Sequence, residues 1–389
     1  MDFSAVLPAW EEKILAAVRR LHQNPELSEQ EYETSAWIRA QLEGEGIEIL
    51  NYPLKTGVLA RIRGSRPGPT VALRADIDAL PVTEDPENPV QSCRPGVMHA
   101  CGHDVHTAAL LGAAGMLNDR REELAGEILL IFQPSEELST GAIAVTGSGV
   151  FRDITPAAFF SMHVMPDIPE GEVSVQSGPI MAAQEGFTIE VLGKGSHGAS
   201  PHLSHDPIVA AVDIVNGLQK VDSRMIDPMK PFVLSVCSIH GGAAFNIVPE
   251  TCTIMGTCRY LHNELREQIV AAVTNTAEHT AAVYGCRAEV SFYKSLFANV
   301  NHSDLLPIAR ASAAQVLGEA AVMQAPMRMS SEDYSMFSQI APTFMYHVGC
   351  GWDENSPPLH NSRFRVSDRV LLNSALLMAD TAARALETL

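Results

Sequence analysis

The segment 98-MHACGHDVHT-107 holds the densest set of residues that could carry out chemistry. Cys101 and His103 stand two positions apart, and His106 follows three residues later. A thiolate and an imidazole are good ligands for a divalent metal of intermediate softness. A cysteine beside a histidine also fits a thiol nucleophile with a general base. This segment alone leaves both a metal site and a nucleophilic cysteine open.

A pair of carboxylates, Glu136 and Glu137, lies just beyond a strand-like run in 131-IFQPSEE-137. Adjacent side chains on an extended backbone point in opposite directions. We therefore expect one carboxylate to bind a metal while the other faces solvent or substrate. An ordinary acidic loop is the alternative when the pair is considered alone.

Further polar residues stand near the ends of other predicted elements. His163 follows the strand-like run 157–162, and His360 lies in a proline-rich loop. Asp76 and Asp78 follow a strand at a spacing of two and so share one face. Such carboxylates commonly hydrogen-bond ligand histidines and fix the orientation of the ring, although this pair could also cap a turn. Together these features predict one shared site.

The elements that must position these residues alternate between strand and helix. Helices are predicted at 9–22 and from Ser28, where Ser28 and Glu31 form a capping-box pattern, to Gly44 or Gly46. The next expected elements are strands at 57–62, 70–75, 127–132 and 157–162 and a helix at about 105–118. This alternation predicts an α/β sheet covered by helices on both faces, with sites at the carboxyl ends of strands.

The pattern changes after about residue 182. Strands are predicted at 187–193, 232–239, 251–259 and 287–293, with helices from Asp206-Pro207 and at about 262–284. This β-α-β-β-α-β order predicts a compact α+β sandwich, 183–293, inserted into a discontinuous catalytic domain, 1–182 and 294–389. Helices near 303–317 and 331–339, a strand at 343–348 and a helix from about 367 return to the first architecture.

Composition narrows the classes of partner. The chain has 389 residues and a formal net charge of −19, which disfavours binding to nucleic acid or to an anionic membrane surface. No apolar run approaches the roughly 18 residues of a membrane span, and the first residues do not resemble a signal peptide. Seven widely spaced cysteines indicate a reducing, cytoplasmic setting rather than a disulfide framework.

At these residues the sequence resembles the di-metal aminoacylase and carboxypeptidase superfamily. It is most similar to the branch that contains hippurate hydrolase and the plant indole-acetyl-amino-acid hydrolases. The matching segments, in family order, are RADIDALP, MHACGHDVHT, FQPSEE, MHV, GKGSHGASPH, GGAAFNIVPE, SSEDY and LHNSRF. They run from residue 73 to 364, and the resemblance implies a zinc-exopeptidase-like catalytic domain with an inserted lid or dimerisation domain.

The resemblance also implies roles for individual residues. Two divalent metals would be held by Cys101, His103, Glu137, His163 and His360, with the Cys101 sulfur as a bridge. Glu136 would be the general base, and Asp78 would orient a ligand histidine. Cysteine favours zinc, while the nitrogen and oxygen ligands admit manganese, cobalt or nickel.

Other roles implied by the resemblance concern the substrate and the surroundings of the metals. His197 would help to stabilise the oxyanion, and Asn246 and Arg259 would hold the substrate carboxylate. Asp76 stands where other branches place a metal-binding histidine, and Glu332 would support His360. His106 and His202 receive no role.

The function that follows is metal-dependent hydrolysis of small N-acyl amino acids, of the acetyl, hippurate or aryl-acyl type, to an acid and a free amino acid. A small dipeptidase or carboxypeptidase is the nearest alternative. A metal-dependent peptide-binding protein without catalysis is an alternative of another class. The resemblance implies a homodimer or larger homo-oligomer formed through the inserted domain.

Overall fold

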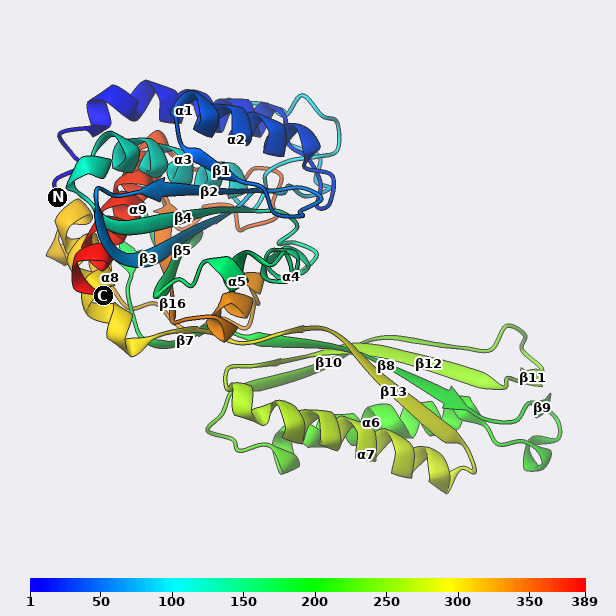
Figure 1. Ribbon diagram of the computed structural model, residues 1–389. Helices are drawn as coiled ribbons and strands as arrows, with labels where there is room; N and C mark the ends of the chain where they lie inside the picture. The colour runs from blue at the N-terminus through cyan, green and yellow to red at the C-terminus, as the bar shows by residue number, and fades with distance from the viewer. The chain divides into compact units, whose positions relative to one another are not determined.

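The computed structural model describes residues 1–389, which form two compact units. Unit 1 comprises Met1–Gly178, Val300–Pro326 and Asp333–Leu389, and unit 2 comprises Pro179–Asn299 and Met327–Glu332 (Figure 1). The short return of 327–332 to unit 2 was not anticipated from the sequence. The action of unit 2 as a lid or dimerisation domain stays a prediction.

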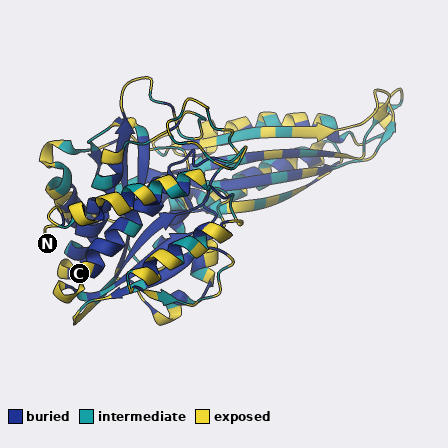
Figure 2. Cartoon of the chain, turned by 90° about the horizontal axis from the view of Figure 1, so that it is seen from above, coloured by how far each residue is buried: buried dark blue, intermediate teal, exposed yellow.

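Unit 1 is built on a mixed eight-stranded sheet. In spatial order its strands are β1 (Glu48–Leu50), β2 (Val58–Arg63), β4 (Ala125–Gln133), β3 (Arg66–Asp76), β5 (Ala158–Pro169), β16 (Thr343–Gly351), β6 (Val173–Ser174) and β15 (Val322–Met323). The central strands β4, β3, β5 and β16 are parallel to one another. They are buried along most of their length, as expected for strands covered on both faces (Figure 2). The predicted α/β class is confirmed.

Helices cover both faces of this sheet. On one face, α3 (His103–Asp119) and α9 (Asp368–Thr388) pack against each other and against β3, and α1 (Leu7–Gln23) packs outside α3. On the other face, the ring of Phe159 on β5 lies 5.4 Å from that of Phe151 and 5.0 Å from that of Phe337. The remaining helical segments of the unit are α2 (Tyr32–Gly44), η1 (Arg121–Glu123), α4 (Gly141–Gly147), α5 (Val150–Asp153), η4 (Ser303–Leu305), α8 (Leu306–Leu317), η5 (Glu319–Ala321) and η6 (Asp333–Gln339).

Unit 2 is a four-stranded antiparallel sheet with two long helices on one face. Its strands, in spatial order, are β10 (Phe232–Gly241), β12 (Thr251–Tyr260), β8 (Ala183–Leu192) and β13 (Arg287–Leu296), and its helices are α6 (Pro207–Met225) and α7 (Arg266–Val283). The carboxylate of Asp206 caps α6 by accepting from the amides of Ile208 and Val209. The proline at the first helical position has no N–H, so these two amides are the first donors of the helix that need an acceptor. A two-stranded ribbon, β9 (Ser196–His197) with β11 (Ile247–Val248), extends from one end of the sheet.

The short elements are the remainder of the fold. They are β7 (Gly178–Met181), β14 (Asn299–Asn301), η2 (Pro201–Leu203) and η3 (Asn263–Leu265). No helix combines the length and the apolar character that a membrane crossing requires.

Three local predictions are wrong in informative ways. The second helix begins at Tyr32 rather than Ser28, because the Ser28 hydroxyl donates to Asp78 Oδ2 at 2.7 Å instead of capping a helix. The last stretch predicted as helix, 331–339, is a 3₁₀ segment that begins at Asp333. The strand expected to end at 162 continues to Pro169, so that His163 lies within β5.

Candidate metal centre

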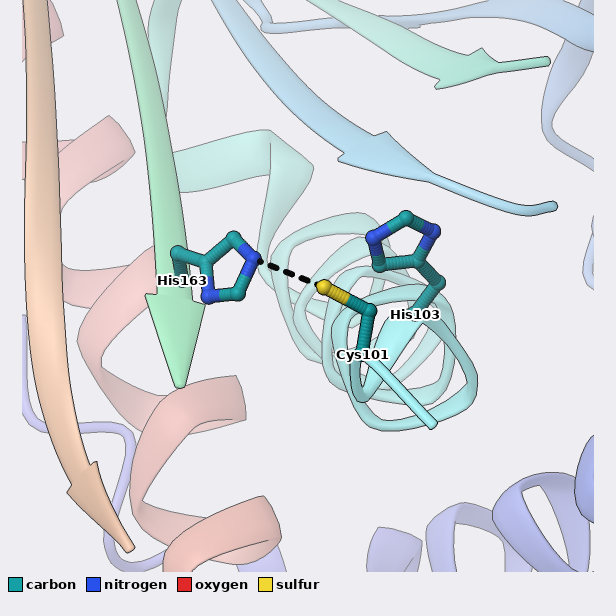
Figure 3. Close-up of side chains that lie close together, drawn as sticks. All are labelled: Cys101, His103 and His163. Carbon is teal, nitrogen blue, oxygen red and sulfur yellow. Dashed lines mark hydrogen bonds between the residues drawn. The ribbon is translucent and has the colours of Figure 1, made fainter. Parts of the chain in front are cut away.

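Side chains from separate elements of unit 1 converge on Cys101. Its Sγ lies 3.5 Å from Nε2 of His163 on β5, and His103 follows it at the start of α3 (Figure 3). The potential ligand atoms of Cys101, His103 and His163 all lie within 4.8 Å of one another, as do those of Cys101, Glu137 and His360. Cys101 belongs to both groups, so its sulfur lies between two candidate cation positions.

Gly102 allows the Cys101–His103 segment to approach β5 closely. Its backbone is left-handed, with φ at 86°, and an added Cβ would lie 2.5 Å from Cγ2 of Val164. Any other residue at this position would strain the backbone and push the thiol away from His163. The close approach to β5 therefore requires a glycine between Cys101 and His103.

The hydrogen bonds of the two buried histidines prepare them as ligands. Nδ1 of His163 donates to the carbonyl of Val164 at 2.7 Å, and Nδ1 of His103 lies 2.9 Å from the carbonyl of Asp78. Each Nδ1 must then carry the proton, because its neighbour is a carbonyl oxygen. In the neutral form of each ring Nε2 then carries the lone pair, and this is the form of imidazole that binds a metal.

Two buried polar atoms in the centre have no hydrogen-bond partner. They are Nε2 of His103 and Oε1 of Glu137, and they lie 3.9 Å apart. Nε2 of His360 lies 3.4 Å from the same Glu137 oxygen. Burying such atoms unpaired is costly, whereas a cation between them would satisfy all three. The donor set of sulfur, imidazole nitrogen and carboxylate oxygen fits a divalent metal.

The electrostatic environment of the centre favours positive charge. Burial opposes the charge on His103, yet Asp76, Cys101 and Asp78 outweigh burial and hold its pKa well above the usual value. The close contacts of its ring with Cys101 and Glu137 raise the pKa of His360 to about 10. Burial and the neighbouring His106 hold the pKa of His163 well below its usual value, so this ring is neutral.

The two adjacent glutamates do not lie on extended backbone, contrary to the prediction. Residues 136–139 form a turn, with Ser135 in the left-handed region at φ 52°. In this turn both carboxylates approach His103, and ligand atoms of Glu136, Glu137 and His103 lie within 4.8 Å of one another. The amide of Asp333 donates to Oε1 of Glu136 at 3.4 Å.

Asp78 forms hydrogen bonds with several parts of the candidate metal centre. Its Oδ1 lies 3.2 Å from Nδ1 of His103, and its Oδ2 accepts from the amide of Glu137 at 3.0 Å and from the hydroxyl of Ser28. Burial would raise the pKa of Asp78, but the bond with His103 and these other hydrogen bonds lower it, so the side chain is a carboxylate. One carboxylate thus fixes both a histidine and the turn that carries the glutamates.

His106, which received no role from the sequence, holds Asp76. Its Nδ1 lies 2.6 Å from Oδ1 of Asp76, and its Nε2 accepts from the amide of Val164 at 3.1 Å. Both ring nitrogens are therefore engaged. The other oxygen of Asp76, Oδ2, lies 3.6 Å from Nε2 of His103. A carboxylate oxygen of Asp76 thus lies close to the candidate metal centre. In the sequence, Asp76 stands where other branches of the superfamily are expected to have a histidine.

Sequence reasoning missed Arg74, a fully buried arginine beneath the centre. Its guanidinium donates to Oδ2 of Asp76 at 2.9 Å, to Oδ1 of Asp333 at 3.1 Å and to the side chain of Gln133 at 2.9 Å. Asp333 also accepts from Gln133 at 2.7 Å and from the amide of Ala142. A charged residue inside a strand that otherwise reads as buried was the signal that could have revealed this network.

The predicted site residues of unit 2 fall into two places. His197 and Asn246 lie together on the exposed β9–β11 ribbon, where the amide of Gly198 donates to the carbonyl of Asn246 at 2.8 Å. Arg259 lies at the other end of β12, paired with Gln184, and donates to the hydroxyl of Ser331. From Thr251 to Arg259 the strand spans about 26 Å at about 3.3 Å per residue. One chain therefore does not bring Arg259 near His197 or Asn246.

The tautomer of His197 is set by its own loop. The amide of Ala199 donates to Nδ1 of His197 at 3.0 Å, so the proton of a neutral ring is on Nε2. Because the side chain is exposed, this N–H is available to a ligand. Glu332 is buried in the segment 327–332 of unit 2, and its support of His360 stays a prediction.

A thiol, imidazoles and carboxylates gather at the strand ends of a mixed α/β sheet, around candidate cation positions. This arrangement is typical of a metal-dependent hydrolase. The chain matches the model of peptidase family M20/M25/M40 over residues 72–384 and belongs to that family. The family resemblance read from the sequence is confirmed.

Relatives and a solved structure agree with this assignment over nearly the whole chain. The N-acetylcysteine deacetylase of Bacillus subtilis (strain 168) is 40% identical over 98% of this chain and 99% of its own. IAA-amino acid hydrolase ILR1-like 4 of Arabidopsis thaliana is 38% identical over 94% of this chain and 84% of its own. The crystal structure of the Bacillus subtilis YXEP protein, described as a dinuclear metal-binding peptidase from the M20 family, is similar with a TM-score of 0.86 and 36% identity. It covers 98% of this chain and is itself covered completely.

Proposed function

We propose that the chain hydrolyses the amide bond of small N-acyl amino acids, releasing an acid and a free amino acid, with two divalent cations per chain. The relatives named as a deacetylase of N-acetylcysteine and a hydrolase of indole-acetyl-amino acids support this substrate class. The observation that carries the proposal is the position of Cys101, which is shared by two groups of potential ligands beside unpartnered buried atoms of His103 and Glu137.

The proposed ligands are the five residues predicted from the sequence, Cys101, His103, Glu137, His163 and His360. A pair of divalent cations held there would polarise the amide carbonyl and lower the pKa of a bound water. The sulfur ligand favours zinc, while manganese, cobalt and nickel remain compatible with the nitrogen and oxygen ligands. Asp78 would keep His103 in its ligand tautomer through the bond to Nδ1.

Glu136 is the proposed general base. It is buried, it lies beside His103 and Glu137, and the amide of Asp333 holds one of its oxygens. From this position the carboxylate would take a proton from the attacking water and deliver it to the leaving amine. The leaving nitrogen takes up that proton and departs as a neutral amine, and the acyl group departs as a carboxylic acid, so that the two products together account for the one water consumed.

The residues of unit 2 would bind the substrate. Arg259 would pair with the carboxylate of the amino acid portion, giving an anionic substrate a fixed partner in a chain of net charge −19. His197 would donate from Nε2 to the oxyanion that develops on the scissile carbonyl. Asn246, next to His197 on the ribbon, would contact the same substrate.

These roles require a second chain. Because about 26 Å of β12 separates Arg259 from the end of the strand that adjoins the ribbon with His197, one small substrate cannot contact both within a single chain. We therefore propose a homodimer in which the ribbon of one chain completes the site of the other. The edge strand β10 is a candidate interface, since Val233 and Ile239 on it and Val212 on the adjacent α6 are exposed.

The compartment is proposed from the cysteines. All seven are free in the structure, including the exposed Cys93 and Cys237. This supports the reducing cytoplasm expected from the sequence.

The proposal is tested by Glu136→Gln, which removes the base but keeps the size of the side chain. We expect hydrolysis of N-acetyl amino acids to fall by a factor of about 10²–10⁴, with the metal content unchanged on elemental analysis. A variant that loses no activity would refute the role of Glu136. Wild-type protein that binds metal but hydrolyses no N-acyl amino acid would favour the binding-protein alternative.

The competing enzyme function is a small dipeptidase or carboxypeptidase. The YXEP structure is described as a peptidase, and this observation supports a peptidase as the second candidate function. Rates on hippurate, on acetyl amino acids and on dipeptides, compared with the same metal-loaded protein, separate the two. Faster turnover of dipeptides than of every N-acyl amino acid would overturn the preferred substrate class.

A further inference from the structure

The turn that carries Glu136 and Glu137 has an unusual backbone conformation. Ser135 and Ser139, which stand on either side of the two glutamates, both lie in the left-handed region, with φ at 52° and 58°. Residues other than glycine adopt this region reluctantly, because their Cβ then approaches a carbonyl oxygen of the backbone. Such a conformation persists only where its surroundings fix it. The contacts of Ser135 therefore help to decide where the two carboxylates lie.

The carboxylate of Glu31 accepts both polar hydrogens of Ser135, although 104 positions separate the two residues. Its Oε1 accepts from the amide of Ser135 at 2.8 Å and from the hydroxyl at 3.2 Å. Its Oε2 accepts from the hydroxyl of Thr56 at 2.8 Å, which fixes the plane of the carboxylate. Glu31 has an exposed fraction of 0%, and Ser135 and Thr56 are also buried, so water does not compete for these bonds.

Two hydrogen bonds to one oxygen restrain the backbone of Ser135 directly. The N–H and the side chain of a residue lie on either side of its N–Cα bond, and rotation about this bond is φ. When Oε1 of Glu31 holds both the N–H and the hydroxyl, φ is confined to the values that keep both donors on that oxygen. The Ser135 hydroxyl is held further because it accepts from the amide of Glu29 at 2.7 Å.

The other anchors of the turn act farther along the chain. Oδ2 of Asp78 accepts from the amide of Glu137 at 3.0 Å. The carbonyl of Ser135 accepts from the amides of Thr140 and Gly141 at 3.3 and 3.1 Å. These bonds hold the middle and the end of the turn, whereas the bonds to Glu31 hold its start, where the backbone sets the direction of the two glutamates that follow.

We propose that Glu31 is a positioning residue for hydrolysis, because its hold on Ser135 directs Glu136 toward the attacking water and Glu137 toward the cations. This role rests on the proposed functions of Glu136 and Glu137. Glu31 itself belongs to none of the groups of potential metal ligands and is fully buried, so it acts through the turn. The property that matters is an acceptor oxygen at the right distance, rather than a negative charge.

Two variants of Glu31 separate distance from charge. Glu31→Gln keeps the length of the side chain and an acceptor oxygen for Ser135, and its amide can donate to the hydroxyl of Thr56, which can also accept. Glu31→Asp keeps the charge but withdraws both oxygens by one methylene. We expect Glu31→Gln to behave like wild type and Glu31→Asp to be impaired. A role of the charge alone would give the opposite order and would overturn the proposal.

The impairment is measured in two ways on the full chain. For hydrolysis of an N-acetyl amino acid at saturating zinc, Glu31→Asp should lower kcat about tenfold with KM nearly unchanged, because the residues proposed to bind the substrate lie in unit 2. The affinity for zinc alone, measured by competition with a chelator, should fall about tenfold, since the turn also carries Glu137. Wild-type kcat and zinc affinity in Glu31→Asp would overturn the proposal.

Rescue by glycine distinguishes a positioning role from a general effect on stability. Glycine adopts positive φ without strain, so Ser135→Gly added to Glu31→Asp should restore most of the lost kcat and zinc affinity. All variants are compared at a temperature where circular dichroism shows each of them folded. A double variant as impaired as Glu31→Asp would contradict control through φ of Ser135. Glu31→Gln keeps the shape of the buried side chain, and a tenfold loss in this variant alone would also count against the proposal.

Glu26→Asp is the matched control. Glu26 is a buried glutamate of the same segment, and its carboxylate accepts from the amides of Glu33 and Thr34 in α2 rather than from the turn. Its shortening should leave kcat and zinc affinity unchanged, and an equal loss in this variant would show that any buried carboxylate of the segment has the same effect.

The two readouts keep this role separate from the proposed function. Wild-type protein that hydrolyses no N-acyl amino acid would refute the proposed function, while the zinc affinities would still test Glu31. Wild-type hydrolysis together with an unimpaired Glu31→Asp would refute only the role of Glu31.

Discussion

At the scale of single residues, the central feature is that one sulfur belongs to two groups of potential metal ligands. Cys101 contributes to the group with His103 and His163 and to the group with Glu137 and His360. If both groups bind a cation as proposed, a change at Cys101 removes a ligand from both positions, while a change at His163 removes a ligand from one.

The shared sulfur predicts that variants at Cys101 and at His163 bind different numbers of metal ions. We expect Cys101→Ala to retain well under one cation per chain and His163→Ala to retain about one, because a divalent metal needs about four ligands for tight binding. Elemental analysis of the purified variants measures the content. Cys93→Ala, which removes an exposed free thiol, should keep two. Two tightly held cations in Cys101→Ala would contradict the shared sulfur.

His22 predicts a pH dependence of stability. Burial opposes its charge, but hydrogen bonds to Asp104 and Glu84 outweigh burial and raise its pKa to about 10. Such a group stabilises the fold fully below its unfolded pKa of about 6.5, and the stabilisation is lost as the pH rises through about 10. The pKa values of Asp104 and Glu84 are lowered, so their contribution is lost as the pH falls below about 4.

We therefore expect His22→Gln to lower the free energy of unfolding by about 3 kcal/mol at pH 7, because it leaves two buried carboxylates without their cation. The difference from wild type should shrink above pH 10. Urea unfolding at pH 7 and pH 10.5 measures both values, with the exposed His279→Gln as the control. A difference that stays constant between the two pH values would argue against a charged His22.

Residue types and spacing were sufficient to predict which side chains gather, but not how their atoms are used. The engagement of both nitrogens of His106 depends on Asp76 and Val164, which lie 30 and 58 positions away. Arg74 was missed because its partners Asp333 and Gln133 are brought to it only by the assembled sheet. Such contacts have no signature in local sequence.

At the scale of elements, long periodic segments were predictable and short ones were not. The strands β2, β3, β4 and β5 and the helices α1 and α3 lie where hydrophobic periodicity indicated them. β9 and β11 have two residues each, too few for any periodicity, although they carry or adjoin His197 and Asn246. The start of α2 was misread because Ser28 has a tertiary partner, Asp78, that competes with the cap.

The packing of α1 on α3 predicts the effect of glycine replacement. A Cβ on Gly115 would lie 2.1 Å from the ring of Trp10. We expect Gly115→Ala to lower the free energy of unfolding by about 1–3 kcal/mol despite the better helix propensity of alanine. Gly147→Ala, in a helix where an added Cβ meets nothing within 4 Å, is the control and should leave stability equal or slightly higher. Chemical denaturation compares the two, and equal stability of both variants would show that Trp10 moves aside freely.

At the scale of the whole molecule, unit 2 separates two groups of residues that are proposed to bind the substrate. Its sheet holds Arg259 at the end where the chain enters β8 and holds the ribbon with His197 at the opposite end. The β-α-β-β-α-β order of this unit could be predicted from the alternation of its strands and helices. The separation could not, because it follows from the antiparallel register of β8 with β12.

The separation predicts complementation between inactive variants. Arg259→Ala and His197→Ala should each be nearly inactive alone. In a mixed dimer, one site has both natural residues and the other has neither. After random exchange of subunits, about half of the dimers are mixed, so activity should return to about a quarter of wild type. Activity assays on the mixture test this, with two preparations of Arg259→Ala as the control. No recovery after proven exchange would place both residues in one chain's site.

The length of β12 thus affects how activity depends on the concentration of the protein. If each centre needs residues from two copies, isolated copies carry parts of centres and catalyse nothing. Turnover would then fall faster than the number of molecules on dilution below the dissociation constant of the pair, following the law of mass action. The length of β12 would in this way make the rate of hydrolysis depend on the concentration of the protein in the cell.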